Sequence, residues 1–539
     1  MKNHTYFKIV FFIYAVALFI NIGSFGVVES SDARYAEIAR EMFVSGDFIH
    51  PNLLDVHHYH KPPLTYQITA LGYKLFGVNA FGARFFLQIA ILLQLVLIYL
   101  LTNQLFKNNQ TALWATIIYM SYPLVLVSSR NLTTDAFLAT FALWSIYSWV
   151  KYRKSGNIFY LYSFTVSLGM GFLTKGPVIF IVPVVFILFF NRIQKSKTSF
   201  NIHHVLAWLL FLGIALSWFV YLSIQNTDFM NYFLGRQTAD RFAKNVFGRT
   251  EPFWYFIVFG PLVALPWFIP LIVLIKKQRK NFTKKSIYIA LLMGCIIPLI
   301  FFSISSSKRI LYILPIYSLM AILTAQLFSK ISIEKSKIIY RILIGFLFVL
   351  CVAFSTALFI NTGYIVPKVL SFISLAMILG MVGFNKTMRF NYKQKSMIIS
   401  IITSIYLIVS SGVILSENQL KVNSPKPITD FIINEKLNDR NVLVYNTIKP
   451  SIAFGLNKSI ISLYDGNSSL DRETQFEKDL EWKKYLIDMQ NDKELQYLKE
   501  ILKKSTVLLL YKEEPPEHLK WVLSYYENKV VMGKWNIYY

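Results

Sequence analysis

The sequence predicts an all-α polytopic membrane protein that ends in a small soluble α/β domain. Of its 539 residues, 55% are hydrophobic and 16% aromatic, and the mean hydropathy is +0.46. A soluble core of this length could not bury so much apolar surface, so most of it must face lipid. The second observation is a series of about thirteen apolar runs, most of them close to the roughly 20 residues that cross a bilayer.

The first expected span covers residues 6–25. It has basic flanks and no small-residue cleavage site before Glu29, so we expect an uncleaved anchor with a cytoplasmic N-terminus. The other expected spans are residues 82–101, 111–128, 135–150, 158–174, 177–190, 205–223, 253–275, 286–303, 310–328, 339–361, 366–383 and 397–415.

Positive charge supports this count and gives the orientation. The net charge is +26, but lysine and arginine fall in short clusters in every second gap between the apolar runs. This pattern is typical of cytoplasmic loops and not of a basic nucleic-acid-binding face. We therefore expect no nucleic-acid partner, and we expect the segment after the last span to lie outside the cytoplasm.

The domain boundaries follow from the same pattern. We expect a transmembrane catalytic domain at residues 1–416, with extracytoplasmic loops at about 27–81 and 224–252, and an extracytoplasmic α/β domain at 417–539. In the latter, short β-branched runs at 442–445, 506–511 and 529–532 alternate with a charged helical stretch at 477–504. Cys295 and Cys351 lie in apolar runs and are expected to be packing residues.

The first outer loop carries charges that solubility alone does not require. Ser31 can cap a helix that starts at Asp32, with an apolar stripe that would place the helix along the membrane surface. That stripe consists of Tyr35, Ile38, Ala39 and Met42. Asp32 could simply complement the helix dipole. Alternatively, it could act in transfer from a lipid-phosphate sugar, which requires a carboxylate beside the acceptor and cations beside the departing phosphate.

Lys61 and three histidines stand near the end of this loop. Pro62-Pro63 holds Lys61 in an extended stretch, where it could anchor the membrane interface or contact a phosphate. His57, His58 and His60 near Asp55 are metal ligands by type, and a divalent metal such as zinc could bind there. Adjacent histidines on an extended segment point apart, so the metal site stays one of two alternatives.

Further cations lie on the same outer side. The later outer loop contains Arg236, Arg241, Lys244 and Arg249, and short gaps add Arg130 with Asp135, Lys175-Gly176-Pro177 and the run Ser305 to Arg309, which includes Lys308. Each charge could merely anchor a helix, but together they suggest a pocket for an anionic, phosphate-bearing ligand.

These segments carry a family resemblance over about residues 1 to 330. The segments, in the family's order, are SDARYAEIAREM with GDFIHPNL, YHKPPLTY with ALGYKLFG, FLTKGP, EPFWYF and SSSKRILYILPIY. The sequence resembles the GT-C membrane glycosyltransferases of family 39, closest to the bacterial 4-amino-4-deoxy-L-arabinose transferases that modify lipid A. Protein O-mannosyltransferases are more distant relatives.

The resemblance implies roles for particular residues. The family's loop opens with an acidic pair whose first acid is catalytic, whereas this chain has Ser31-Asp32, so the catalytic carboxylate would be Asp32 or, as a substitute, Glu29. Arg34 and Lys61 would contact the donor phosphate, with Arg241, Arg249 and Lys308 as further candidates. The family's metal-binding glutamate is His60 here, which could still hold zinc.

The resemblance also implies the reaction. We expect an enzyme of the bacterial inner membrane, active on the periplasmic side, that transfers a sugar from undecaprenyl phosphate to lipid A or another cell-envelope acceptor. The sugar could be an aminoarabinose-like pentose or a hexose. A protein O-glycosyltransferase of the same superfamily is an alternative, and a transporter or flippase of anionic lipid-linked substrates is another, disfavoured because few charges lie inside the apolar runs.

Overall fold

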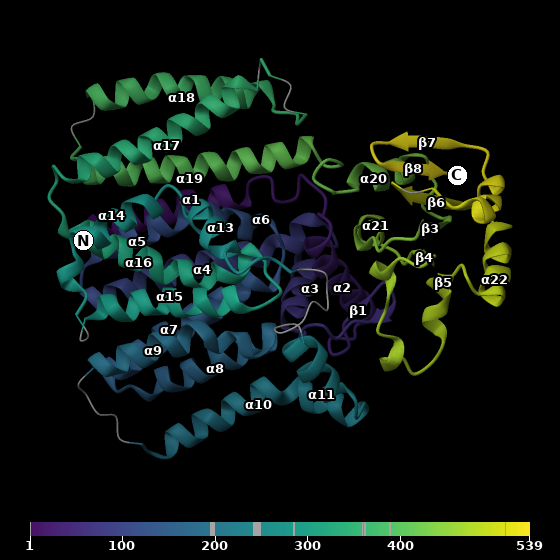
Figure 1. Cartoon of the computed structure of the whole chain (residues 1–539), viewed down its shortest axis with the longest axis horizontal. Coiled ribbons are helices and arrows are strands. Elements are labelled where there is room, and N and C mark those ends of the chain that lie inside the picture. Colours follow the sequence, from purple (N-terminus) through teal and green to yellow (C-terminus); the bar gives the residue numbers. More distant parts are fainter. Residues whose placement is uncertain are drawn as a thin grey trace. The chain divides into compact units, whose positions relative to one another are not determined.

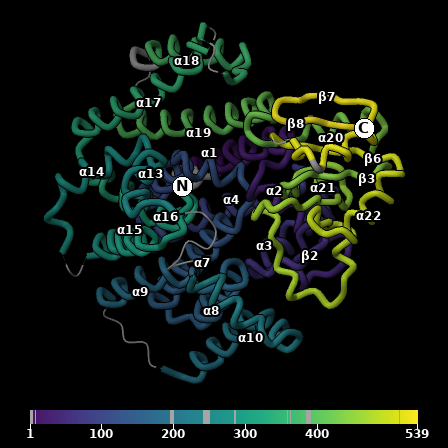
Figure 2. Tube along the Cα trace, turned by 45° about the vertical axis from the view of Figure 1, so that its right-hand side comes forward, coloured from purple at the N-terminus to yellow at the C-terminus, as the bar shows by residue number. Residues whose placement is uncertain are grey.

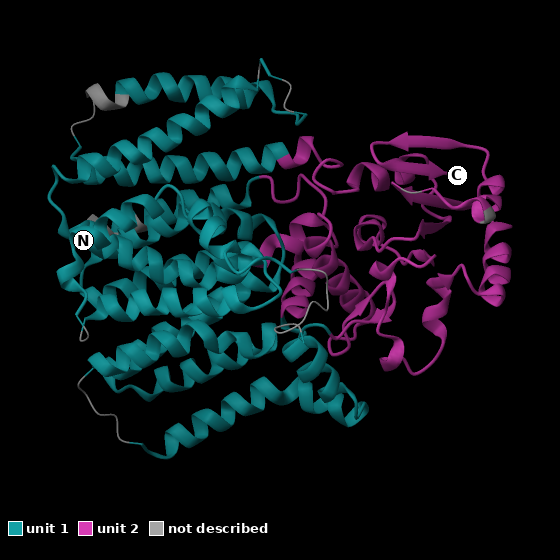
Figure 3. Ribbon diagram, in the orientation of Figure 1, with its two compact units in different colours: residues 1–20, 60–64, 87–414 teal, residues 21–59, 65–86, 415–539 magenta. Residues whose placement is uncertain are grey.

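The computed structural model is mostly helical and divides into two compact units, each of which is described by itself (Figure 3). It describes residues 2–194, 200–240, 250–283, 286–357, 359–360, 363–387, 390–512 and 514–539. The first unit comprises residues 1–20, 60–64 and 87–414, and the second comprises residues 21–59, 65–86 and 415–539.

The first unit is built from long apolar helices (Figure 1). They are α1 (Lys2–Phe19), α4 (Ala80–Phe106), α5 (Asn109–Met120), α6 (Pro123–Arg130), α7 (Thr134–Ser155), α8 (Ile158–Lys175), α9 (Ile181–Ile193), α10 (Ile202–Gln225), α11 (Phe229–Asn231), α13 (Tyr255–Val263), α14 (Phe268–Lys277), α15 (Ile287–Ile304), α16 (Leu314–Lys330), α17 (Ser336–Thr356), α18 (Lys368–Thr387) and α19 (Tyr392–Glu417). Short helices of other types are η1 (Gly176–Phe180), η2 (Tyr232–Asp240), η3 (Arg279–Asn281) and η4 (Ile310–Ile313).

Many of these helices are suited to cross a membrane. In the described part of the chain, seven helices are long and apolar enough to span a bilayer, or up to nine if each of two bent pairs counts as one span. Shorter apolar helices occur at Lys8–Phe19 and Lys368–Gly383. The chain is therefore a multi-pass membrane protein, as its hydropathy predicts.

The bend between α5 and α6 is stabilised by polar side chains from other helices. The axis turns by 61° between α5 and α6, where Pro123 starts the new helix. The carbonyl of Met120 at this break accepts hydrogen bonds from Tyr14 Oη at 3.4 Å and from Ser404 Oγ at 2.5 Å. A carbonyl freed inside an apolar unit needs such partners, because lipid offers none.

Helices α17, α18 and α19 lie side by side in Figures 1 and 2. Ser374 Oγ on α18 and Tyr406 Oη on α19 are 2.5 Å apart, and Phe354 on α17 packs against the Tyr406 ring. This polar contact fixes the rotation of two otherwise apolar helices.

The first span ends earlier than the sequence predicts. Helix α1 stops at Phe19, whereas the apolar run extends to residue 25. Beyond the helix, the carbonyls of Ile22, Phe25 and Gly26 accept hydrogen bonds from the Arg84 guanidinium at 2.8–3.1 Å. An arginine side chain therefore replaces the helical hydrogen bonds of this stretch.

The second unit begins with the first outer loop. This loop forms α2 (Ser31–Ser45), the hairpin β1 (Asn52–Leu53) and β2 (Val56–His57), and α3 (Leu64–Phe76). The prediction that Ser31 caps α2 is wrong: the helix includes Ser31, and the residue at its N-cap, Ser30, makes no side-chain capping bond. Ile38, Ala39 and Met42 of the apolar stripe are buried and Tyr35 is half-buried, and the charged residues Glu37, Arg40 and Glu41 of α2 are buried as well.

The C-terminal part of the second unit forms a six-stranded sheet with the order β5-β4-β3-β6-β8-β7. Strands β5, β4, β3 and β6 are parallel. Beyond β6, strands β8 and β7 extend one edge of the sheet, and each pairs antiparallel with its neighbour. The strands are β3 (Asn441–Tyr445), β4 (Ile461–Tyr464), β5 (Leu486–Asp488), β6 (Thr506–Tyr511), β7 (Lys529–Met532) and β8 (Trp535–Tyr538). The accompanying helices are α20 (Lys426–Asn434), α21 (Pro450–Leu456) and α22 (Asp492–Leu502), with short turns η5 (Ser468–Leu470), η6 (Thr474–Phe476), η7 (Glu481–Lys484) and η8 (Glu517–Tyr525).

The three strands expected from β-branched runs are confirmed at residues 441–445, 506–511 and 529–532. The prediction of a helix at residues 477–504 is wrong for the first half of that stretch. There the chain forms η7 and then strand β5, and only α22 is an α-helix. Ile487 is completely buried in the core, and this burial overrides the local charged pattern.

Candidate active site

A large cavity opens within the first unit. Its volume is about 590 Å³, and most of its wall is apolar. The wall consists of Pro177, Val178, Ile181, Phe233, Ala239, Phe301 and Phe302, with polar atoms from Lys61, Lys175, Gln237, Thr238, Ser305, Ser307 and Tyr312. Two lysines in a largely apolar cavity suit a ligand that joins an anionic group to a hydrocarbon chain.

Lys175 is held in place from two sides. Its Nζ donates to Asp135 Oδ1 at 2.5 Å and lies 4.1 Å from the ring centre of Tyr312. The lysine ends helix α8, and Gly176 then takes a φ of +71°, a conformation that favours glycine. The break directs the chain into η1, whose Pro177 and Val178 line the same cavity.

Of the cations predicted in the later outer loops to bind phosphate, the structure describes Lys308. Lys308 Nζ donates to the carbonyls of Glu251 at 2.7 Å and Ser305 at 2.6 Å, and it is not among the residues that line the cavity. Burial lowers the Lys308 pKa. Arg241 and Arg249 lie outside the described residues, as does Lys244.

Asp32 lies in the second unit as one half of a buried ion pair. Its Oδ2 is 2.5 Å from Arg84 Nη2, and it also accepts the backbone N–H of Val28 at 2.9 Å. Its other oxygen, Oδ1, is 3.4 Å from Arg84 Nε. Asp32 and Arg84 are 1% and 0% exposed, so this carboxylate is enclosed by its partners.

Glu29, also in the second unit, has a more open environment. Its Oε1 accepts hydrogen bonds from both the hydroxyl and the backbone N–H of Ser451 at the start of α21. Burial raises the pKa of the Glu29 carboxyl, while the Ser451 hydrogen bonds and the charges of Lys449 and Arg34 oppose that rise. Arg34 therefore lies near enough to Glu29 for its positive charge to stabilise the ionised carboxylate.

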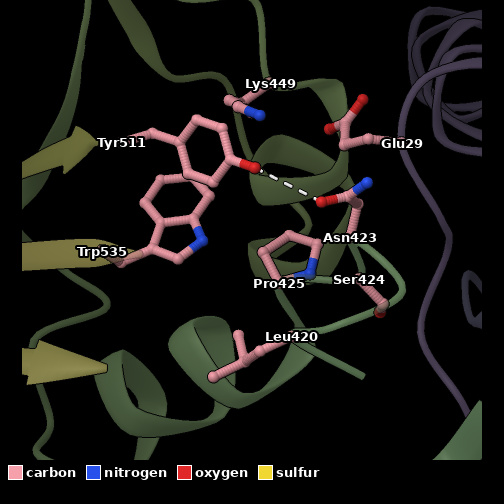
Figure 4. A pocket seen from close by; sticks show the side chains of 8 residues that line it. All are labelled: Glu29, Leu420, Asn423, Ser424, Pro425, Lys449, Tyr511 and Trp535. Atoms are coloured by element: carbon pink, nitrogen blue, oxygen red, sulfur yellow. Dashed lines mark hydrogen bonds between the residues drawn. The ribbon is translucent and has the colours of Figure 1, made fainter. Parts of the chain in front are cut away.

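Glu29 also lines a small cavity of about 10 Å³ (Figure 4). The other lining residues are Leu420, Asn423, Ser424, Pro425, Lys449, Tyr511 and Trp535. Lys449 Nζ lies 3.6 Å from the ring centre of Tyr511 and 5.5 Å from that of Trp535, and Tyr511 Oη donates to Asn423 Oδ1 at 3.3 Å. The cavity thus combines a cation, a carboxylate and two aromatic rings.

Among the described residues, the histidines of the first loop are not grouped with other possible metal ligands. His57 Nδ1 lies 2.5 Å from Asn52 Oδ1, and His58 is buried. In the part of the chain that the structure describes, no group of three His, Cys, Asp or Glu side chains is placed to hold a metal ion. Because His60 belongs to no such group, the residues present do not fit the expected zinc site.

A buried acidic cluster explains most of the other charges of this loop. Glu37 pairs with Arg40 at 2.6 Å, and the two oxygens of Glu41 accept the backbone N–H groups of Leu54 at 2.6 Å and Asp55 at 3.1 Å. Burial and the neighbouring charge of Glu37 raise the pKa of Glu41 well above its usual value. These side chains hold the turn between β1 and β2, which is a structural role.

Sequence reasoning missed two partners of the candidate carboxylates. Arg84 stands near the start of an apolar run, and a lone arginine there was the available signal for a buried counter-ion. Lys449 lies 420 residues after Glu29 in a segment without a recognisable motif, so no local pattern could have joined the two.

Comparisons with known proteins agree with the resemblance stated above. Residues 4–233 match the family described as dolichyl-phosphate-mannose-protein mannosyltransferase. An undecaprenyl phosphate-alpha-4-amino-4-deoxy-L-arabinose arabinosyl transferase of Proteus mirabilis is 32% identical over 302 residues, 55% of either chain. Its counterpart from Aeromonas hydrophila is 32% identical over 299 residues, 54% of either chain. The matched region spans about half the length of these relatives.

The crystal structure of ArnT from Cupriavidus metallidurans bound to undecaprenyl phosphate superimposes with a TM-score of 0.78, at 19% identity. The match covers 99% of this chain and 98% of that one. The chain is thus similar in sequence to bacterial arabinosyl transferases over about half its length, and it has the fold of the transferase ArnT.

Proposed function

We propose that this chain is a membrane glycosyltransferase that transfers a sugar from undecaprenyl phosphate to lipid A or another cell-envelope acceptor. The observation that carries the proposal is the cavity of about 590 Å³ that joins Lys61 and Lys175 to an apolar wall. A polyprenyl phosphate has both parts that such a cavity would recognise, an anionic head and a hydrocarbon chain. The names of the arabinosyl transferases, which specify an undecaprenyl phosphate donor, support the same donor class.

The reaction needs stabilisation of the leaving phosphate. As an acceptor oxygen bonds to the anomeric carbon, the bond from that carbon to the phosphate oxygen breaks and negative charge grows on the polyprenyl phosphate. Cations fixed beside that oxygen lower the barrier, because their attraction increases as the charge develops. Lys61 and Lys175 would supply this charge, and the Asp135 contact and the Tyr312 ring would hold Lys175 in position.

A carboxylate would act at the acceptor. Glu29 and Asp32 are the candidates, and Arg34 contributes positive charge near Glu29. Among the residues that the structure describes, His60 belongs to no group of three His, Cys, Asp or Glu side chains placed to hold a metal ion, so the step is written with side chains alone. The sugar would be an aminoarabinose-like pentose or a hexose.

A protein O-glycosyltransferase is the second candidate, favoured by the match of residues 4–233 to a family of protein mannosyltransferases. Mass spectrometry of lipid A, surface glycans and membrane proteins from a deletion strain distinguishes the two. Loss of a sugar from lipid A or a glycan supports the first candidate. Loss of a sugar only from protein favours the second, and no change in any fraction contradicts both.

The same proposal includes thirteen spans in the bacterial inner membrane, with the C-terminal α/β domain at 417–539 on the periplasmic side. A Ser469→Cys variant places a thiol at an exposed position of that domain, and Lys280→Cys places one in a predicted cytoplasmic gap. In cells with a permeabilised outer membrane, a membrane-impermeant thiol reagent should label the first variant and spare the second. Labelling of Lys280→Cys alone would invert the protein and remove the argument for a lipid-linked donor.

A further inference from the structure

Two hydroxyl groups in the wall of the large cavity already have partners within the first unit. Thr238 Oγ1 donates to the carbonyl of Phe233 at 2.9 Å. Ser305 Oγ donates to the carbonyl of Ser307 at 3.4 Å. The hydrogen-bonding capacity of these donors is used by the protein, so neither hydroxyl requires a ligand to satisfy its proton.

Two other polar atoms on side chains of the same wall are unpaired. In the part of the chain that the structure describes, neither Gln237 Oε1 nor Ser307 Oγ has a hydrogen-bond partner. Gln237 is 4% exposed and Ser307 is 7% exposed, so bulk solvent does not replace the missing partners. Buried polar groups nearly always have partners, and an unpaired one requires an explanation such as a bound group. Because both side chains line one cavity, a single ligand could satisfy both atoms.

The amide of Gln237 is oriented from its other end. Its Nε2 donates to Tyr232 Oη at 2.8 Å within the same short helix η2, which leaves Oε1 as the unpaired atom. An amide oxygen accepts hydrogen bonds and cannot donate them, so its partner must be an O–H or N–H group. The terminal torsion of a glutamine is broad, and the amide can therefore adjust to the position of such a group.

The three parts of a polyprenyl-phosphate sugar differ in whether they can donate to this oxygen. The hydrocarbon chain has no polar hydrogen. The phosphate is esterified on both sides and ionised at neutral pH, so its oxygens only accept, and lysines such as Lys61 and Lys175 suit it. Only the sugar has O–H or N–H groups. The Ser307 hydroxyl both donates and accepts, so it too can bind a sugar hydroxyl.

We infer that Gln237 and Ser307 form a subsite for the sugar of the lipid-linked donor, in which Gln237 Oε1 accepts a hydrogen bond from a hydroxyl or amino group of that sugar. The two residues determine specificity, because they favour a polyprenyl phosphate that carries a sugar over one that does not. This inference rests on the proposed function and adds the part of the donor that the cavity recognises besides its phosphate and its lipid. The subsite binds and orients the sugar.

The test measures binding to the full chain in nanodiscs without an acceptor. The labelled probe is tritiated undecaprenyl methyl phosphate, which has the lipid and the phosphate diester of the donor but no sugar. Undecaprenyl phosphate-α-4-amino-4-deoxy-L-arabinose and undecaprenyl-phosphate glucose compete with the probe, and the competition gives their dissociation constants. The sugar preference is the dissociation constant of the methyl diester divided by that of the tighter sugar-bearing lipid. We expect a preference of at least about tenfold in the wild-type chain, the size of one or two hydrogen bonds.

Gln237→Met should lower the sugar preference at least about fivefold, because the thioether fills a similar volume without accepting strongly, and should leave binding of the methyl diester within about twofold of wild type. Ser307→Ala should lower the preference as well. Gln237→Glu should keep it, since a carboxylate oxygen also accepts, even if the added charge weakens binding of every phosphate diester. The exposed control Gln110→Met should match the wild-type chain, and binding of the methyl diester shows that each variant is folded.

The outcomes separate this inference from the proposed function. Equal binding of the methyl diester and the sugar-bearing lipids by the wild-type chain overturns the inference and leaves the donor class intact. An unchanged preference in Gln237→Met, or the same fall in Gln110→Met, also overturns it. Loss of the preference in Gln237→Glu as well as in Gln237→Met would contradict the role of Gln237 as an acceptor. If the wild-type chain binds none of these lipids, the proposed function falls, and the inference falls with it.

Discussion

The two cavities differ in volume and in the side chains that contact their lysines. The cavity of the first unit measures about 590 Å³, and its Lys175 is paired with Asp135. The cavity of the second unit measures about 10 Å³, and its Lys449 faces aromatic rings without an ion pair in the described residues. The larger cavity has the volume for part of a hydrocarbon chain, and the smaller has room for roughly one water-sized group.

This difference shows which ligand each cavity suits when it is taken by itself. A lipid phosphate needs positive charge and an apolar surface large enough for a hydrocarbon chain, and the large cavity has both. The hydrogen bonds from Ser451 to Glu29 fall on one oxygen, Oε1, whereas both oxygens of Asp32 lie within hydrogen-bonding distance of Arg84. Residue type alone does not separate the two cavities, because both contain a lysine.

The largest expected effect concerns the carboxylate that lies outside both cavities. Arg84→Ala should destabilise the protein by about 3–5 kcal/mol, because it leaves Asp32 buried without a counter-ion. Thermal unfolding of the purified protein in detergent measures the loss. The control Lys426→Ala breaks an ion pair whose side chains are 39% and 46% exposed, and it should cost less than about 1 kcal/mol. If Arg84→Ala and Lys426→Ala lower the free energy of unfolding by the same amount, Arg84 does not hold Asp32 tightly, and the contrast between Asp32 and Glu29 is lost.

The next effect tests the large cavity. Lys61→Ala should raise the KM for the undecaprenyl-phosphate donor by about 10- to 100-fold, the size expected for one charge-assisted contact. Lys61→Arg should restore use of the donor only in part, because a forked guanidinium fits a point-charge site imperfectly.

Steady-state kinetics against donor concentration gives these values, with the exposed Lys74→Ala as the matched control. If both Lys61 variants keep the wild-type KM, Lys61 is an interfacial anchor and the cavity is not the donor site.

The smallest effect is a pH dependence of the second unit. Burial, and then the charge of His50, lowers the pKa of His57 from 6.5 to about 4. The folded state therefore favours neutral His57, and its contribution to stability, present above pH 6.5, should decrease as the pH falls toward 4.

Between pH 7 and pH 5 the wild-type chain should lose about 1 kcal/mol more than His57→Gln, a value reduced for the solvent that reaches the ring. Unfolding midpoints at both pH values measure this. Identical pH dependence in the two proteins would mean that His57 keeps its ordinary pKa.

Much of the fold could be predicted from apolar runs and charge clusters. The strands at 442–445 and 506–511 were also predictable, because short β-branched runs rarely form anything else when buried. The end of α1 at Phe19 was not, because a distant arginine takes over the carbonyls that follow. Strand β5 was missed since its burial depends on neighbouring strands.

The sequence predicted individual residues of the candidate site, but it did not predict which residues contact each other. The first loop identified Glu29, Asp32 and Lys61 by composition and resemblance. Which carboxylate is enclosed depends on Arg84, and which is available depends on Ser451 and Lys449. Such long-range pairs leave no spacing pattern in one sequence.

The most direct test of the account asks which donor the chain uses. The full chain in nanodiscs is given a synthetic undecaprenyl-phosphate sugar and an envelope glycolipid extract, and the release of free undecaprenyl phosphate is measured by mass spectrometry. We predict release that requires both donor and acceptor and that falls at least about tenfold in Lys61→Ala at subsaturating donor. Transfer from a soluble nucleotide sugar, or no release from any polyprenyl-phosphate sugar, would contradict the account.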